Sequence, residues 1–315
     1  KMTVSETKEE YLKHGYSIVA FTDHEVMVPH TNLTDENFLA ITSTEISINK
    51  LKNCDFSFNK TYHLNIYSPM SNKSDFNTFT ESRVWIKDSH KYITAKQKEI
   101  NYDRVYSVEG INDIIKNAND EGCLVSYNHP VWSLQNYSDY IGLKGLWGVE
   151  WYNTGCAREG FIDTIQPIDD LLRKGEKVYP LATDDAHKLQ DCFGGYVMIS
   201  ADQLKYDKIF AALKNGDFYA STGPEFVEIS VENGVVKVVT SPVAFVGVST
   251  ACRHLFAKRA DGELLTEVSF DMGWHFDMVK NGVNERPYIR VTVVDEFGNS
   301  AFSRAYFLNE FLNND

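Results

Sequence analysis

Short apolar runs alternate with amphipathic stretches over residues 3–222 of the chain. Parallel strands are buried on both faces, so this rhythm predicts βα units around a largely parallel sheet. The strands are expected at residues 17–21, 38–46, 62–67, 123–127, 146–152, 178–182 and 195–199. A capping box at Thr3 and Glu6 predicts a first helix that ends at Gly15. Further helices are expected at 112–121, 161–174 (with Pro167 a potential kink) and 206–215.

Residues 71–108 interrupt this rhythm. The segment is rich in Ser, Asn, Asp, Lys and Thr, and its apolar residues, Trp85 and Ile93 among them, are loosely placed. We interpret it as an insertion. A long insertion in a compact α/β domain is a lid or substrate loop about as often as a solvated decoration, and the sequence leaves both alternatives open.

The pattern changes after Gly223, where apolar and polar residues alternate in short runs such as 235–239 and 288–294. Asp261 followed by Gly262 is a hairpin signal, and no helix of convincing length is expected here. The sequence therefore predicts two domains: an α/β domain over residues 1–222, which contains the insertion, and an antiparallel β-sandwich over residues 223–315.

Composition narrows the functions open to such a chain. Its 315 residues include 31 Lys and Arg against 44 Asp and Glu, a net charge of −13, so the chain lacks the basic field that binds duplex nucleic acid. The sequence shows no membrane span and no signal peptide, and we expect a cytoplasmic enzyme or binding protein. The five cysteines are widely spaced, which predicts reduced thiols, mostly buried, and neither a disulfide framework nor a thiolate zinc site.

Three of the predicted strands share one feature: side chains of metal-binding types follow where the apolar run ends. Parallel strands point their carboxyl ends at one face of a barrel or sheet, so these side chains are expected to converge. Two further strands contribute a carboxylate and an imidazole. In chain order the candidates are Asp23, His24, Glu45, His63, His129, Asp185 and His187.

Imidazole and carboxylate ligands without thiolates favour Zn²⁺, Mn²⁺ or Fe. Two or more such ions about 3.5 to 4 Å apart can bind a phosphoryl oxygen and ionise a water, so the residue set indicates phosphate-ester hydrolysis. A single histidine at a strand end is more often a hydrogen-bonded structural residue, and we interpret His14, His90, His254 and His275 in that way. Three repeats of one pattern are not explained by coincidence.

The same residues resemble the motifs of the PHP (polymerase and histidinol phosphatase) family in their order along the chain. Residues 22–24 (T-D-H) are similar to the second family motif, 128–130 (N-H-P) to its x-H-P and 185–187 (D-A-H) to its closing D-x-H. Glu45 and His63 match by local context alone. The resemblance covers residues 1–222, and the remainder is similar to the small β-sandwich found behind some PHP domains.

The resemblance implies a distorted, TIM-like (βα)7 barrel that holds up to three manganese, iron or zinc ions and hydrolyses phosphate esters with a metal-activated water. The implied metal ligands are His24, Glu45, His63, His129, Asp185 and His187, and Glu45 would bridge two ions. Asp23 and His187 are the implied catalytic residues. His30 and Arg158 are candidates to bind a small phosphorylated substrate, although a surface salt bridge is the commoner role for an arginine such as Arg158.

One family motif has no counterpart. The first family strand carries H-x-H, and the sequence here begins at the helix that follows it. We expect a segment upstream of Lys1 to supply that strand, and fewer than three ions in the chain as given. Two alternatives to the phosphoesterase stay open: a catalytically reduced PHP-like scaffold that binds a phosphorylated ligand or a protein partner, and an amidohydrolase-like barrel that acts on C–N bonds.

Overall fold

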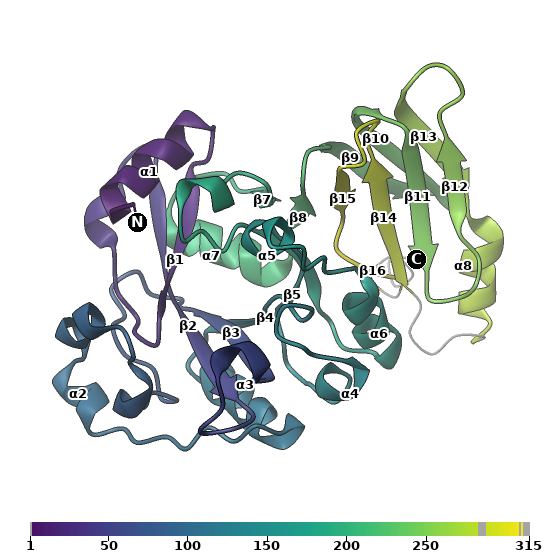
Figure 1. Ribbon diagram of the computed structural model, residues 1–315. Helices are drawn as coiled ribbons and strands as arrows, with labels where there is room; N and C mark the ends of the chain where they lie inside the picture. The colour runs from purple at the N-terminus through teal and green to yellow at the C-terminus, as the bar shows by residue number, and fades with distance from the viewer. Residues whose placement is uncertain (1, 283–287, 309, 311–315) are drawn as a thin grey trace.

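The computed structural model describes residues 2–282, 288–308 and 310, and comprises an α/β part followed by a β-rich part (Figure 1). The α/β part consists of α1 (Val4–Lys13), β1 (Ile18–His24), β2 (Leu39–Asn49), β3 (Thr61–Tyr67), α2 (Ala95–Lys98), α3 (Val108–Asp120), β4 (Leu124–Tyr127), α4 (Tyr137–Tyr140), β5 (Gly148–Asn153), α5 (Thr154–Arg158), α6 (Gln166–Lys174), β6 (Tyr179–Thr183), β7 (Tyr196–Ile199), α7 (Tyr206–Asn215) and β8 (Phe218–Ser221). Short 3-10 helices lie at Thr31–Leu33, Phe56–Phe58, Glu81–Arg83, Lys87–Tyr92 and Leu189–Asp191.

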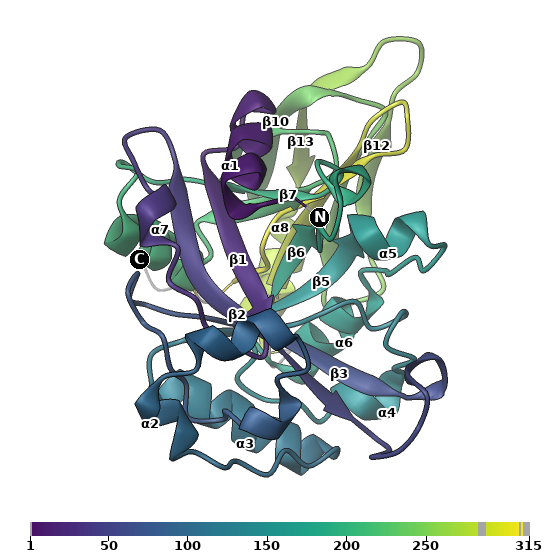
Figure 2. The same ribbon diagram turned by 60° about the vertical axis from the view of Figure 1, so that its left-hand side comes forward.

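Strands β1 to β6 form one sheet in sequence order, which curls into a half-barrel (Figure 2). β1, β2, β4, β5 and β6 run in one direction, whereas β3 is antiparallel to both β2 and β4. The sheet is therefore mixed rather than fully parallel. Because β3 is reversed, its first residues lie at the edge where its neighbours end. Within the described residues β1 pairs with β2 alone and β6 with β5 alone, so these strands do not close into a barrel.

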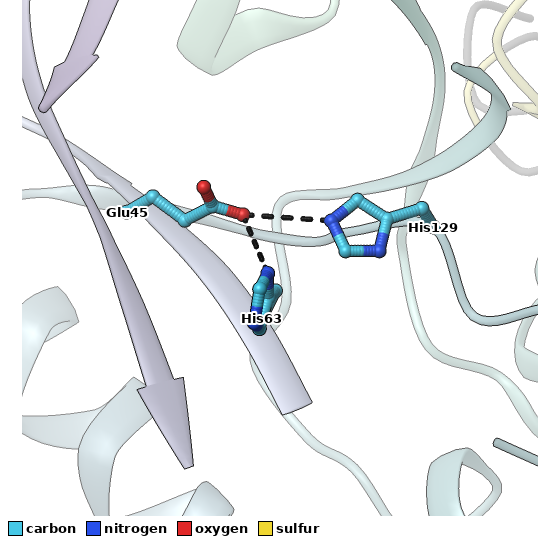
Figure 3. Close-up of side chains that lie close together, drawn as sticks. All are labelled: Glu45, His63 and His129. Atoms are coloured by element: carbon cyan, nitrogen blue, oxygen red, sulfur yellow. Dashed lines mark hydrogen bonds and ion pairs between the residues drawn. The ribbon is translucent and has the colours of Figure 1, made fainter. Parts of the chain in front are cut away.

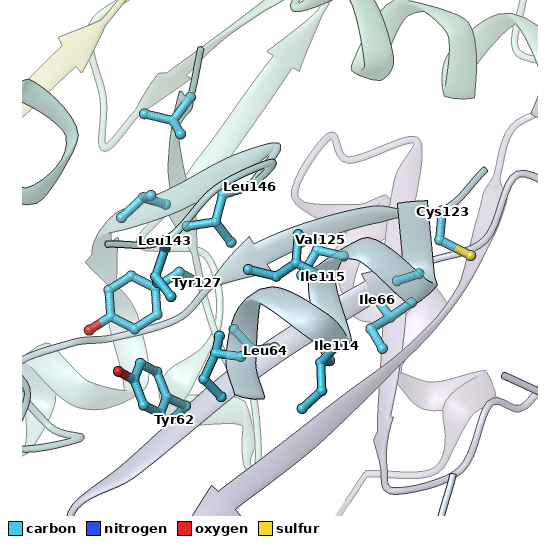
Figure 4. Close-up of a cluster of buried hydrophobic side chains, with 14 of the residues drawn as sticks. Tyr62, Leu64, Ile66, Ile114, Ile115, Cys123, Val125, Tyr127, Leu143 and Leu146 are labelled. Carbon is cyan, nitrogen blue, oxygen red and sulfur yellow. The ribbon is translucent and has the colours of Figure 1, made fainter. Parts of the chain in front are cut away.

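Helix α3 covers β3 and β4 and shows why the amphipathic stretches become helices (Figure 4). Its buried positions recur at spacings of one, three and four residues, so one face of the helix meets the sheet. The helix begins earlier than the predicted residue 112, because the Ser107 hydroxyl accepts the Gly110 N–H as an N-terminal cap. The buried side chains on this face are Ile111, Ile114, Ile115 and Ala118.

The ends of the other helices can be compared with the capping and proline signals in the sequence. The capping box at Thr3 and Glu6 is confirmed, and α7 has the predicted bounds. Helix α6 begins at Gln166 rather than at 161, and Pro167 lies in its first turn, where a missing N–H leaves no hydrogen bond unmade, so it starts the helix instead of kinking it. None of the helices in the described part of the chain is both long enough and apolar enough to cross a bilayer.

The predicted insertion, residues 71–108, packs against the half-barrel. Phe76, Phe79 and Val84 are buried in the same hydrophobic cluster as β3 and α3. Arg104 and Glu25 form a buried ion pair, with 2.5 Å between Nη1 and Oε2. Buried apolar side chains and a buried ion pair do not fit a loosely solvated decoration.

The β-rich part consists of β9 (Phe226–Glu232), β10 (Val235–Val243), β11 (Phe245–Thr250), β12 (Phe256–Arg259), β13 (Leu265–Asp271), α8 (Gly273–Lys280), β14 (Tyr288–Val294), β15 (Ser300–Phe302) and β16 (Tyr306–Phe307). One sheet has the order β13-β10-β9 and the other contains β12-β11-β14-β15. Val236 and Val238 of the first share a core with Val246, Val248 and Val291 of the second. The sequence predicts no helix of convincing length here, whereas the structure has the eight-residue helix α8 one residue after β13.

Backbone pairing continues across residue 222. β7 and β8 extend the larger sheet, in which Ala220 pairs with Phe302 and Ser221 with Ala301. Arg290 of β14 also reaches α6, and its guanidinium donates to both carboxylate oxygens of Asp169 at 3.0 Å. The two parts are therefore joined by strand pairing and by a buried ion pair.

We expect Arg290→Met to lower the free energy of unfolding by about 3 to 5 kcal/mol, because it leaves the Asp169 carboxylate without its counter-ion in a mostly buried position. Arg290 lies over the ring of Phe302, and Arg259 lies over the ring of Phe245. Arg259→Met is the matched control, because Arg259 is on an exposed strand. Its effect should be about 1 kcal/mol or less. Urea unfolding measures both, and equal effects would contradict the importance of the buried pair.

Candidate metal centre

The strand register brings the predicted ligands to one edge of the half-barrel. His24, the last residue of β1, lies opposite Glu45 of β2 in the parallel ladder. His63 of β3 lies opposite Ser47, two residues beyond Glu45, and residues two apart on a strand share a face. His129 follows the end of β4, and residues 185–187 follow the end of β6. The reversal of β3 explains why His63 is near the start of its strand.

Glu45 lies at the centre of this group. Its Oε1 is 3.0 Å from His63 Nδ1 and 3.5 Å from His129 Nε2 (Figure 3). Its Oε2 is 3.2 Å from His24 Nδ1. The Asn128 amide donates to Oε1 at 3.2 Å. One carboxylate thus faces three imidazoles with both of its oxygens, which is an arrangement suited to a carboxylate shared between two cations.

A second set of ligand atoms lies beside His24. The Nε2 atoms of His24 and His187 are 3.4 Å apart. His187 Nδ1 lies 2.9 Å from the backbone carbonyl oxygen of Asp185, and because a carbonyl only accepts, Nδ1 carries the proton of the neutral ring and Nε2 has the lone pair. This is how a metal-ligating imidazole is usually oriented. The Asp185 carboxylate links the two sets, with Oδ2 3.8 Å from His129 Nε2.

Three residues at these strand ends have left-handed backbone conformations without being glycine. The φ angles are 65° at Glu25, 23° at His129 and 51° at Asp185. Such conformations cost of order 1 to 3 kcal/mol each and cluster at functional sites. The Glu25 carboxylate accepts the Ser47 N–H at 2.9 Å and binds Arg104, so the insertion helps to hold the residue next to His24.

Buried Glu150 fixes the strand ends relative to one another. Its Oε2 accepts the His129 N–H at 2.8 Å and the Asn153 amide at 3.1 Å, and its Oε1 accepts the Thr183 hydroxyl at 2.8 Å. Burial raises the pKa of Glu150 to about 7, although the neighbouring His129 opposes the shift. Glu150 therefore supports the left-handed backbone of His129 and ties the ends of β4, β5 and β6 together.

The electrostatics favour positive charge at the centre. Burial of His129 acts to lower its pKa, but the hydrogen bond with Glu45 and the charges of Asp185 and Glu150 outweigh burial and raise that pKa to about 10. Burial also acts to raise the pKa of Glu45, yet the imidazoles of His63, His129 and His24 hold it well below its ordinary value. Buried acids that stabilise a cation on a protein side chain are also arranged to bind a metal cation.

Cys156 lies beside the predicted ligands, although the cysteine spacing predicts no thiolate zinc site. Its Sγ and ligand atoms of His129 and Asp185 all lie within 4.8 Å of one another. The expectation relied on the spacing of cysteines, which cannot detect ligands drawn from three separate elements. The sequence signal that could have placed Cys156 here is Asn153. Its side chain accepts the Cys156 N–H and caps helix α5 at the end of β5.

The other predicted site residues lie around this centre. Asp23 Oδ2 is 2.8 Å from Nε2 of the buried His30, so the two form a pair next to His24. Arg158 is half exposed, its Nε lies 3.9 Å from Asp191 Oδ1, and within the described chain it makes no hydrogen bond or ion pair with the six predicted ligands. Asp184, the neighbour of Asp185, accepts the Tyr11 and Thr154 hydroxyls and three backbone N–H groups of residues 193–195, which gives it a structural role.

The centre opens to solvent on one side. A cavity of about 1030 Å³ is lined by β1, β6 and β7 and reaches His24, Glu45, Asp185 and His187. Side-chain exposure rises from 2% at His129 to 56% at His187. Trp85 of the insertion is 68% exposed, and its ring centroid is 5.5 Å from that of His24. A ligand would approach from the side of His187 and Trp85.

No family model, no curated protein and no solved structure matches this chain.

We expect His63→Ala to reduce the zinc or manganese content of the purified protein by about one ion per chain. Loss of a supporting hydrogen bond weakens metal affinity by about 10 to 100-fold, and loss of a ligand should exceed that. His254→Ala is the control, because His254 is an exposed histidine outside this group. Metal analysis by mass spectrometry measures both, and equal metal contents would contradict the assignment of His63.

Proposed function

We propose that this chain is a metal-dependent phosphoesterase, and that its half-barrel is part of a PHP-type (βα)7 barrel. The observation that carries the proposal is the position of Glu45, with both carboxylate oxygens directed at imidazoles. The order of the ligands along the chain agrees with the PHP motifs.

The donor atoms fit divalent transition ions. Imidazole nitrogens and carboxylate oxygens suit Zn²⁺, Mn²⁺ and Fe²⁺. His24 Nδ1 is buried 3.2 Å from Glu45 Oε2, and it has no hydrogen-bond partner among the described residues. A buried polar atom without a partner calls for an explanation, and a bound ion supplies one.

Each ion would have its own ligands within a shared set. Glu45, His63 and His129 would hold one ion, and Glu45 with His24 would hold a second, with His187 beside His24 as a further ligand. Asp185 extends the set toward a third ion. When bound, such ions lower the pKa of water and neutralise charge on a phosphoryl group.

Because the chain is negatively charged, it would attract an anionic substrate only where cations are bound at this centre. The protein carries a net charge of −13, and Glu45, Glu150 and Asp185 surround the ligands. These acids would repel a phosphate in the absence of cations, and bound ions reverse the local sign. We propose small phosphorylated molecules as the substrates, rather than duplex nucleic acid or a membrane surface.

Two side chains at the open side have roles in the proposed reaction. Asp23 lines the cavity, and its Oδ2 is bonded to His30, which leaves Oδ1 to hold a water or to accept a proton. His187 is the most exposed of the predicted ligands. We assign Asp23 to proton transfer, and His187 to binding and to orientation of the leaving group.

The direct test is turnover of p-nitrophenyl phosphate and bis(p-nitrophenyl) phosphate by the full chain, before and after chelation and with Mn²⁺, Fe²⁺ or Zn²⁺ restored. We expect chelation to abolish turnover and Glu45→Gln to lower kcat/KM by about 10²-fold or more, because a site loses its main charge complementarity. Glu232→Gln, at an exposed glutamate of β9, is the control.

Two results would contradict the phosphoesterase. A protein that binds ions through Glu45 but hydrolyses neither ester would instead be a catalytically reduced scaffold. Turnover of amides or lactones in place of phosphate esters would favour an amidohydrolase-like reaction on C–N bonds.

A second test concerns Asp23. We expect Asp23→Asn to lower kcat by about 10²-fold, the usual contribution of a proton-transfer group, while metal content and KM change little. Steady-state kinetics and metal analysis on the same preparation measure this. Loss of metal in the variant would instead show that Asp23 acts by holding His30 and the adjacent ligand His24 in place.

A further inference from the structure

The sulfur of Cys156 lies in an unusual environment for a buried cysteine. The residue is 4% exposed, and its near neighbours are an imidazole and a carboxylate, those of His129 and Asp185. Buried structural cysteines behave as small hydrophobic residues. Within the described chain Cys156 Sγ has no hydrogen-bond partner, although polar side chains surround it.

The chain holds α5 firmly against the loop that carries Asp185. The Thr154 hydroxyl donates to the Thr183 carbonyl at 3.1 Å and to Asp184 Oδ1 at 2.6 Å. The Gly155 N–H donates to the Asp184 carbonyl at 2.9 Å. A Cβ at Gly155 would lie 3.2 Å from the Asp185 carbonyl oxygen, so glycine allows this close approach. Residues 153–155 therefore fix the position of Cys156 relative to Asp185.

The other described cysteines do not share this arrangement. Cys123 is buried at the start of β4, Cys192 bonds the Lys188 carbonyl, and Cys252 is exposed. Among the described residues only Cys156 belongs to a group of potential ligand atoms with a histidine and an acid. The position of Cys156 beside candidate metal ligands therefore distinguishes it from the other described cysteines.

We propose that Cys156 is a ligand of the ion that His129 binds, and that with Asp185 it adds a thiolate to this site, which then favours Zn²⁺, Co²⁺ or Fe²⁺ over Mn²⁺ and Mg²⁺. Soft thiolate ligands select such ions, whereas carboxylates suit Mn²⁺ and Mg²⁺. The sulfur–metal bond forms as the thiol proton leaves to solvent. This inference rests on the proposed metal centre and goes further in naming which ions it prefers.

The test is a Co²⁺ titration of the full chain after removal of metal. Thiolate coordination produces a sulfur-to-cobalt charge-transfer band in the near ultraviolet, which nitrogen and oxygen ligands do not produce. We expect this band in the wild type and in Cys123→Ser, the matched buried-cysteine control. We expect Cys156→Ser to lose the band while visible cobalt bands show that the ion still binds.

A competition measurement gives the size of the effect. The ratio of Zn²⁺ to Mn²⁺ affinity should fall by about 10-fold or more in Cys156→Ser and stay unchanged in Cys123→Ser, because only the first variant loses a soft ligand. If Cys156→Ser fails to fold, the ¹¹³Cd chemical shift of the cadmium-loaded wild type reports sulfur coordination without any substitution.

The outcomes separate this inference from the proposed reaction. A wild-type protein that binds Co²⁺ without the charge-transfer band, or shows a cadmium shift typical of nitrogen and oxygen ligands alone, would overturn the role of Cys156, and so would failure to bind either ion. A charge-transfer band in a protein that hydrolyses no phosphate ester would support Cys156 as a ligand and contradict the phosphoesterase alone.

Discussion

Placing a carboxylate and three imidazoles together in a buried position is the constraint on which the rest of this structure depends. Glu45 is buried, and burial of an unpaired carboxylate is strongly unfavourable. The imidazoles of His24, His63 and His129 approach it at 3.0 to 3.5 Å and compensate its charge. Such a group can exist only where several strands deliver side chains to one point. The half-barrel edge is that point.

The surroundings of Glu45 keep this arrangement in place. Left-handed backbone occurs at Glu25, next to His24, and at the candidate ligands His129 and Asp185. Glu150 accepts the His129 N–H, and Arg104 of the insertion pairs with Glu25, so conformations that are unfavourable by themselves are stabilised by buried hydrogen bonds and charge. This explains why an insertion of mostly polar sequence is packed against the core.

Sequence patterns predicted much of the scaffold for identifiable physical reasons. Apolar runs locate β1 to β7 within a few residues, and caps locate α1 and α7, because both signals are local. The candidate ligands can be identified because polar residues directly after an apolar run mark the carboxyl end of a strand. Candidates at β1, β2, β3, β4 and β6 lie at one edge.

What the sequence did not predict depends on contacts between distant segments. The reversal of β3 follows from its hairpin with β2, which strand periodicity does not report. Cys156 becomes a neighbour of His129 and Asp185 only once α5 packs against the loop after β6. Arg158 was a candidate by proximity in sequence, and the structure places it beside Asp191. The sequence pattern does not predict helix α8, because its eight residues come just after a strand and no polar linker separates the two.

The most direct test of the central idea, that Glu45 is shared between cations, is anomalous diffraction at the zinc edge from crystals of the zinc-loaded protein. We expect one anomalous peak among Glu45, His63 and His129 and a second beside His24, each within bonding distance of a Glu45 oxygen. Peaks confined to the surface, or a Glu45 carboxylate that contacts no ion in fully loaded crystals, would contradict it.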